Sequence, residues 1–256
     1  MCLLLIALEQ HPIYKLILAA NRDEFYDRPT APARFWKENP ALLAGRDRIA
    51  GGTWLGITRF GKLAALTNYR DPARLKEQAP SRGDLVLHYL ESAVPAGHYL
   101  EAVRGKSDQY NGFNLVLGTV NELFWYSNRG DGTLRLSSGI HGASNHLINT
   151  SWPKVERAKM EINRVLTSKA ELEPEDLFKV LIDRWQPPDE RLPDTGVGLE
   201  WERILGPMFI TSPVYGTRSS TVILVDRRDR VTFVERTYSS VPEQFHDAQY
   251  HFHLTA

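Results

Sequence analysis

The chain has 256 residues, of which 42% are hydrophobic and 24% are charged, and its 31 basic residues balance its 31 acidic ones. This length predicts one domain, residues 1–256, with a sizeable core, and the neutral net charge argues against a nucleic-acid partner because phosphate contacts require a basic surplus. The single cysteine excludes an internal disulfide framework and thiolate-only metal sites, and the histidines lack metal-ligand spacing, so we expect no metal.

The N-terminal segment contains two apolar runs around a short polar break. Residues 2–8, the break EQHP and residues 13–20 predict a β-hairpin. The first run is too short for a signal peptide, no positive charge precedes it, and Glu9 ends it. No stretch approaches the roughly 18 apolar residues of a membrane-spanning helix. We therefore expect a cytoplasmic protein without a membrane span.

The later strands also occur as neighbouring pairs, and helical segments lie between the pairs. Apolar alternation and turn residues predict strands at 53–59, 62–68, 113–119, 122–127, 133–138, 220–226 and 231–238. Helical spacing predicts helices at 81–93, 151–168 and 173–185. Because the strands form hairpins rather than strand–helix–strand units, the pattern predicts an α+β fold with antiparallel sheets.

Three further segments carry patterns that imitate binding or contact sites. Residues 56–63 resemble a phosphate-binding loop, but Leu63 stands where that motif requires Ser or Thr, so we expect a strand, a turn and a strand. The Pro- and Gly-rich residues 184–198 predict a long surface loop, in which 186–198 is a candidate lid or contact surface. His251 and His253 lie near the chain end, where we expect a solvated tail.

The only cysteine, Cys2, precedes a predicted cluster of charges. Antiparallel pairing places position 2 opposite residue 19 or 20, so residues 21–24, with the sequence NRDE, leave the second strand beside the N-terminus. A nearby Arg22 lowers the pKa of a thiol and so increases the nucleophilic thiolate. Removal of Met1 adds an α-amino group that titrates at about pH 8 and can act as the base for the thiol. The alternative is that Cys2 is a small apolar residue of the first strand.

Several separated motifs connect the chain to a known family. They are NRDEFYDRP (21–29), GGTWLGI (51–57), LTNYRDP (66–72), FNLVLG (113–118), SNHLINTSWPKV (144–155) and YGTRSSTVILVD (215–226). With these motifs the chain resembles the NRDE family, also called the transport and Golgi organisation protein two family. That family is similar to N-terminal-nucleophile cysteine hydrolases such as penicillin V acylase and bile salt hydrolase, which cleave non-peptide amide bonds. The resemblance implies an αββα four-layer sandwich of two antiparallel sheets between helices.

The resemblance also implies roles for single residues of this chain. Cys2 would be the nucleophile, Arg22 would stabilise its thiolate, and Asp23 would hold the α-amino group. Asn68 would be an oxyanion-hole donor, Asn145 would be a second polar anchor, and Arg218 would be a late active-site arginine.

Each of these residues also has a purely structural interpretation. Arg22 and Asp23 can form a surface ion pair, and Asn68 can be a turn residue. Asn145 can cap or turn the chain before the helix near residue 153, and Arg218 can be a solvated charge at a strand end.

These residues and the resemblance lead to two hypotheses about function, an enzyme and a ligand carrier. In the first, an amidohydrolase without a cofactor cleaves a small-molecule amide or acyl substrate through Cys2. In the second, which the family's association with haem handling and lipid or acyl metabolism suggests, the same fold binds and delivers haem or an acyl ligand without turnover. The candidate haem ligands are Cys2, His88, His98, His141 and His146. A third, an interaction module that uses residues 186–198, depends on the loop composition alone.

Overall fold

The computed structural model describes residues 3–239 and 243–255, and its strands form two sheets in which every neighbouring pair is antiparallel. The first sheet contains β1 (Leu3–Leu8), β2 (Tyr14–Phe25), β10 (Gly139–Ala143), β11 (Tyr215–Asp226), β12 (Arg230–Tyr238) and β13 (Phe245–His253). Its strand order is β10-β1-β2-β11-β12-β13. The two ends of the described chain therefore belong to the same sheet.

The second sheet contains β3 (Thr30–Phe35), β4 (Leu42–Asp47), β5 (Leu55–Thr58), β6 (Lys62–Asn68), β7 (Phe113–Thr119), β8 (Glu122–Ser127) and β9 (Thr133–Arg135). Its strands lie in chain order, β3-β4-β5-β6-β7-β8-β9. The segment at 56–63 is β5, a turn and β6, as expected, and not a phosphate-binding loop.

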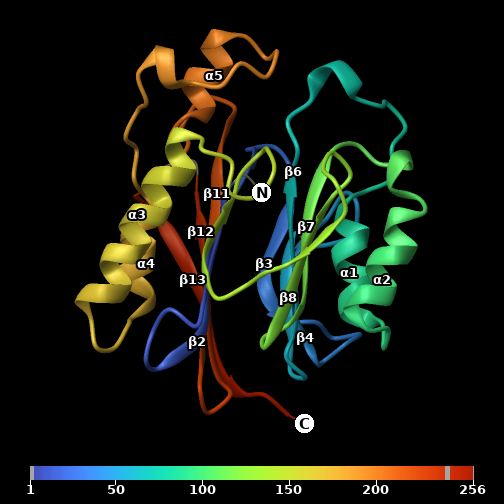
Figure 1. Ribbon diagram of the computed structural model, residues 1–256, viewed down its shortest axis with the longest axis vertical. Helices are drawn as coiled ribbons and strands as arrows, with labels where there is room; N and C mark the ends of the chain where they lie inside the picture. The colour runs from blue at the N-terminus through green and yellow to red at the C-terminus, as the bar shows by residue number, and fades with distance from the viewer. Residues whose placement is uncertain (1–2, 240–242, 256) are drawn as a thin grey trace.

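Helices cover the outer face of each sheet. They are α1 (Gly83–Glu91), α2 (Ala96–Arg104), α3 (Pro153–Ser168) and α4 (Pro174–Leu181), whereas α5 (Leu199–Leu205) lies beyond one end of the sheets. Figure 1 shows α3 and α4 outside the first sheet and α1 and α2 outside the second, with the two sheets face to face between them. The predicted αββα sandwich is confirmed. In the described part of the chain, none of the helices is long and apolar enough to cross a membrane.

Three apolar layers hold the sandwich together. In β1, Leu4 and Ile6 face the second sheet, whereas Leu3 and Leu5 face α3 and α4. A strand that is buried on both faces needs a continuous apolar run, which explains the sequence LLLIAL. Each fully buried aliphatic side chain contributes about 1.5–3 kcal/mol to folding. The third layer lies between the second sheet and α1 and α2, around the buried Tyr89.

The N-terminal hairpin forms as predicted, but its predicted register is wrong. Leu3 lies opposite Asn21, which is two or three residues further along than expected. The turn occupies more of the chain than EQHP, because the second strand begins only at Tyr14 and the Glu9 amide donates to the carbonyl of Lys15. As a result, β2 continues past the first described residue of β1.

The expected solvated C-terminal tail is also wrong. Residues 245–253 form β13, which pairs with β12 along its whole length. Tyr250 and Phe252 pack against the core between the sheets, whereas His251 and His253 point to solvent. This alternation has the period of two that marks a half-buried strand. Strands β3, β4 and β10 and helices α2 and α5 were not predicted from the sequence either, while residues 186–198 do form mostly irregular structure, as expected.

Gly52, between β4 and β5 of the second sheet, lies close to the backbone at the start of α1. A Cβ atom at position 52 would lie 2.7 Å from the backbone carbon of Gly83, which is the first residue of α1. We expect Gly52→Ala to lower the free energy of unfolding by about 1–3 kcal/mol, because the backbone must move apart. Gly97→Ala in α2 is the control, since a Cβ there meets no atom within 4 Å and alanine favours a helix. Urea unfolding measures the free energy of unfolding of both variants, and equal values for the two would contradict the expectation.

Candidate functional site

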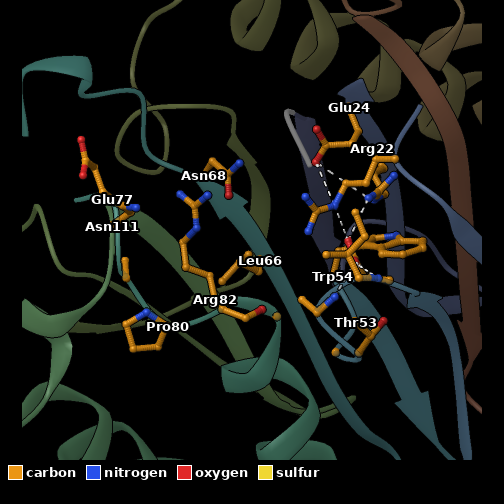
Figure 2. A pocket seen from close by; sticks show the side chains of 18 residues that line it. Arg22, Glu24, Thr53, Trp54, Leu66, Asn68, Glu77, Pro80, Arg82 and Asn111 are labelled. Carbon is orange, nitrogen blue, oxygen red and sulfur yellow. Dashed lines mark hydrogen bonds and ion pairs between the residues drawn. The ribbon is translucent and has the colours of Figure 1, made fainter. Parts of the chain in front are cut away.

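A cleft of about 580 Å³ opens where β6 ends and α1 begins (Figure 2). Arg22 and Glu24 of β2 line one side of it, and Asn68 and Arg82 line the opposite side. Trp54, from the segment that leads into β5, lies beside Arg22. The cleft therefore combines cations, carboxylates, amides and one large aromatic ring, contributed by both sheets.

Arg22 is the most buried charge of the cleft wall, with 5% of its surface exposed. Its guanidinium carbon lies 4.4 Å from the centre of the Trp54 ring, and its Nη2 atom lies 3.5 Å from Asp47 and 3.9 Å from Glu24. Its Nη1 atom has no hydrogen-bond partner among the described residues. Burial lowers the pKa of Arg22, although both neighbouring carboxylates oppose this. An arginine stays protonated nonetheless, so the site holds a fixed positive charge with unused donor capacity.

Asp47 connects Arg22 to the turn after β2. It accepts a hydrogen bond from Arg28 at 2.6 Å and two more from the backbone amides of Ile49 and Ala50. Burial alone would raise the pKa of Asp47, but Arg28 and these amides outweigh it and bring the pKa below its ordinary value. Asp47 is therefore an ionised counter-charge and not a proton donor near neutral pH.

On the opposite wall, Asn68 is the last residue of β6. Its backbone carbonyl accepts a hydrogen bond of 3.0 Å from the side chain of Asn145, which follows β10. Asn145 is buried, and its own backbone carbonyl accepts from the amide of Arg70 at 2.7 Å. The structure thus joins two of the predicted site residues that are far apart in the sequence.

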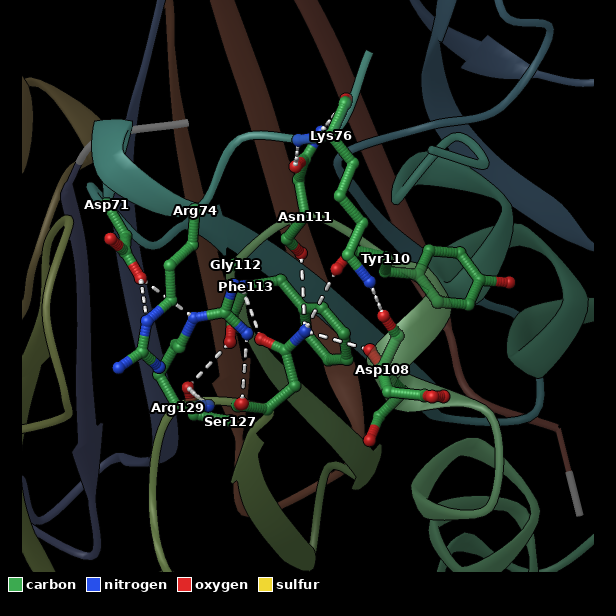
Figure 3. A network of polar contacts seen from close by, with 12 residues as sticks. Asp71, Arg74, Lys76, Asp108, Tyr110, Asn111, Gly112, Phe113, Ser127 and Arg129 are labelled. Carbon is green, nitrogen blue, oxygen red and sulfur yellow. Dashed lines mark hydrogen bonds and ion pairs between the residues drawn. The ribbon is translucent and has the colours of Figure 1, made fainter. Parts of the chain in front are cut away.

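A polar network holds the chain between β6 and α1 in place (Figure 3). Asn111 donates to the carbonyl of Lys76 at 3.1 Å and accepts from its amide at 2.7 Å. Arg129 pairs with Asp71 at 3.1 Å. Arg82, at the start of α1, donates to the carbonyl of Gly112 at 2.9 Å. These contacts fix the wall of the cleft although residues 69–82 contain little regular structure.

Asp23 lies on the other face of β2 from Arg22, because successive side chains of a strand point in opposite directions. Thr217 of β11 donates to its Oδ1 atom at 2.6 Å. Its Oδ2 atom is buried and has no hydrogen-bond partner among the described residues. On the same face Asn21 donates to the carbonyls of Leu181 and Met208. Asp23 is therefore a buried carboxylate with one unused oxygen.

Arg218 occupies an irregularity in β11. Thr217 pairs with Asp23 and Ser219 pairs with Arg22, so Arg218 is the extra residue of a bulge. Its Nη1 atom donates to three backbone carbonyls of the turn after β2, those of Phe25, Tyr26 and Arg28. A bulge redirects a side chain, and here it lets Arg218 hold the turn that carries Arg28.

The structure brings together part of the predicted site. Arg22 and Asn68 line the cleft and Asn145 contacts Asn68, whereas Asp23 and Arg218 do not line it. Cys2, the predicted nucleophile, lies outside the described residues. The catalytic roles of all six remain predictions.

The four histidines proposed as haem ligands do not line the cleft. His88 and His98 are exposed on α1 and α2. His141 contacts the Ser137 carbonyl and Asn149, and burial lowers the pKa of His146, which lies between the rings of Tyr69 and Trp152. Among the described residues, His, Cys, Asp and Glu side chains form no cluster of three or more that could hold a metal ion.

Four residues at or near the cleft were not predicted from the sequence to have a role: Trp54, Arg70, Glu202 and Glu235. Trp54 and Arg70 stand in the motifs GGTWLGI and LTNYRDP, so the motifs were a usable signal for these two. Glu202 and Glu235 lie in segments whose local pattern does not separate a buried carboxylate from a surface one. Their environment depends on distant parts of the chain.

Glu235 lies between the two sheets, close to Arg22. It is 2% exposed and accepts a hydrogen bond of 2.6 Å from the amide of Ala33 on β3. Burial raises the pKa of Glu235 to about 7, although this hydrogen bond, the charge of Arg22 and Thr221 all act in the opposite direction. Near neutral pH the charge next to Arg22 therefore depends on proton binding at Glu235.

Comparison with known proteins relates the whole chain to one family. A family model described as "Transport and Golgi organisation 2" matches residues 1–240. The "Transport and Golgi organization protein 2 homolog" of Homo sapiens is 38% identical over 257 residues, which cover 93% of each chain. The Bos taurus homolog is 37% identical over 275 residues and 99% of each chain. A solved variant of conjugated bile acid hydrolase from Clostridium perfringens is similar with a TM-score of 0.53 at 8% identity, over 99% of this chain and 98% of that one. This last likeness shows the fold.

The proton equilibrium of Glu235 predicts a pH-dependent stability. The folded chain binds the proton more tightly than the unfolded chain, whose pKa is near 4.5, so stability is lost as pH rises toward 7. Glu235→Gln removes this effect, and its free energy of unfolding relative to wild type should rise by about 2–3 kcal/mol between pH 5 and pH 8. Denaturant unfolding at both pH values measures it. Glu122→Gln, on a 45% exposed side chain, should show no such change. If the free energy of unfolding of Glu235→Gln differs from that of wild type by the same amount at both pH values, the raised pKa of Glu235 is contradicted.

Proposed function

We propose that this chain, which belongs to the Transport and Golgi organisation 2 family, is a cysteine amidohydrolase whose nucleophile is Cys2 after removal of Met1. Its substrate is a small molecule with a non-peptide amide or related acyl bond. One observation carries the proposal. Arg22 and Asp23, consecutive residues of β2, each hold a buried charged group with an atom that lacks a partner among the described residues.

Buried polar atoms without a partner are costly, at about 1–3 kcal/mol each and more for charged groups. Both atoms belong to the residues that follow Asn21, and Asn21 lies opposite Leu3. An N-terminal cysteine provides two groups of complementary charge, an ammonium on the main chain and a thiolate on the side chain. In the proposal the ammonium pairs with Asp23 and the thiolate pairs with Arg22. Each of the two partnerless atoms would then have a partner of opposite charge, one on each face of β2.

The proposed reaction proceeds through a thioester. The α-amino group accepts the thiol proton, the thiolate sulfur attacks the carbonyl carbon, and the amide nitrogen leaves with that proton. Water then attacks the thioester, the carbon–sulfur bond breaks, and the thiol and a carboxylic acid are released. Asn68 donates to the oxyanion of each tetrahedral intermediate, and a donor of this kind lowers the barrier by about 3 kcal/mol. The fold shared with the bile acid hydrolase variant supports this chemistry by analogy.

The N-terminus gives the most direct test. The mass of the native protein should lack Met1, and iodoacetamide should label the folded protein once, because Cys2 is its only cysteine. A series of N-acyl p-nitroanilides should be hydrolysed by the wild type and not by Cys2→Ala. Retention of Met1 in the native protein, or a thiol that reacts only after denaturation, would contradict the proposal.

Asp23 is tested by neutralising its charge. Asp23→Asn keeps an oxygen for the hydrogen bond from Thr217 but no longer pairs with an ammonium. We expect hydrolysis to fall by about 10²-fold or more, as for the loss of a positioned acid–base group, with a changed pH profile. Asp229→Asn makes the same chemical change on a 52% exposed side chain and should leave the rate unaltered. Wild-type turnover and pH profile in Asp23→Asn would exclude its proposed role.

A further inference from the structure

A second pair of buried charges lies behind the wall of the cleft. The Nη1 atom of Arg70 donates to Oε2 of Glu202 at 2.5 Å, and their side chains are only 9% and 3% exposed. The Arg70 guanidinium also lies 5.2 Å from the centre of the Trp152 ring. Ion pairs at the surface are flexible and weak, whereas a buried pair with a stacked ring has one defined geometry.

Arg70 holds Asn145 in two ways. Its backbone amide donates to the Asn145 carbonyl at 2.7 Å, and its Nη2 atom lies 3.3 Å from the side-chain oxygen of Asn145. This second contact orients the Asn145 amide group so that its nitrogen donates to the carbonyl of Asn68 at 3.0 Å. The orientation of the peptide at the end of β6, where Asn68 enters the cleft, therefore depends on the guanidinium of Arg70.

Glu202 connects this chain of contacts to the long loop. Its Oε1 atom accepts hydrogen bonds from the amide and the hydroxyl of Thr195, at 3.0 Å and 2.6 Å. Gly198, with φ of 85°, lets the chain turn into α5, whose fourth residue is Glu202. Both oxygens of the carboxylate are thus used, one for the loop and one for Arg70.

We propose that Arg70 and Glu202 are positioning residues that couple the loop at 186–198 to Asn145 and Asn68. Neither residue lines the cleft, and both act through the amide of Asn145. When the pair is intact, the loop is held against the body of the protein and Asn68 is oriented for the oxyanion. This role rests on the proposed hydrolase function, whereas the coupling between the pair and the loop does not.

The central experiment neutralises Glu202. Glu202→Gln has the same shape but loses the ionic attraction to Arg70, so we expect kcat to fall by about 10- to 100-fold, the cost of misplacing a catalytic group by about 1 Å. KM and the rate of Cys2 alkylation should stay unchanged, because Asn68 acts on the transition state and not on the thiol. Hydrogen exchange of residues 193–198 and 66–70 should become faster in the same variant.

A matched control exists in the same loop. Asp189 pairs with Arg203 of α5 at 2.5 Å, but both side chains are exposed and neither contacts Arg70. Asp189→Asn should therefore leave kcat and the exchange of residues 66–70 unchanged. Arg70→Lys keeps the charge but not the planar fork, so it should keep part of the loop protection and lose the contact with Asn145.

Thermal unfolding of each variant separates loss of the fold from loss of positioning. Arg70→Lys, which keeps a charge beside Glu202, provides the test if Glu202→Gln does not fold. Wild-type kcat and wild-type exchange in the folded variants would overturn the inference. If the wild type hydrolyses none of the anilides, the proposed function fails, and the exchange of residues 193–198 and 66–70 still decides whether the pair couples the two segments.

Discussion

The pairing of β1 with β2 sets the positions of the charged residues in the candidate site. Leu3 lies opposite Asn21, so β2 extends beyond the start of the described β1 as far as Phe25. β11 pairs with the other edge of β2 over the same residues, which keeps this extension within the sheet. Because both faces of the sheet are covered, Arg22 and Asp23 enter buried surroundings on opposite sides. Charged groups at a strand end are usually solvated. Here the extended end of β2 lies inside a sheet with both faces covered, so the side chains of Arg22 and Asp23 are kept from solvent.

Burial gives these charges their chemical character. Asp47 is ionised because Arg28 and two backbone amides compensate for its lost solvation, whereas Glu235 has less compensation and retains its proton to a higher pH. Arg22 remains charged in either case. It lies 3.5 Å from Asp47, its charge acts on Glu235, and its Nη1 atom has unused donor capacity. The electrostatic state of the cleft is thus set by desolvation as much as by the number of charges.

The sandwich also explains how the cleft is built from distant segments. Gly52 lies against the start of α1, and Trp54 of the same segment lies against Arg22 of β2. Asn145 reaches from the first sheet to the end of β6 in the second. The family match covers most of the chain, whereas the bile acid hydrolase variant shares the fold at 8% identity. A common fold places strand ends and loops in comparable positions, and the chemistry still depends on the individual side chains there.

The fold class, most strands and the family could be predicted from the sequence, because apolar periodicity and turn residues are local and the motifs are specific. The sequence also selected Arg22 through the hairpin pairing near Cys2, and Asn68 and Asn145 through the resemblance, but without their contacts. Four features depend on long-range contacts and emerged only from the folded chain: the register of the N-terminal hairpin, the strand at 245–253, the bulge at Arg218 and the buried pair of Arg70 and Glu202. Register depends on a turn whose length local patterns define poorly, and the burial of a carboxylate depends on residues more than a hundred positions away. Such long-range contacts leave no periodic signal in a single sequence.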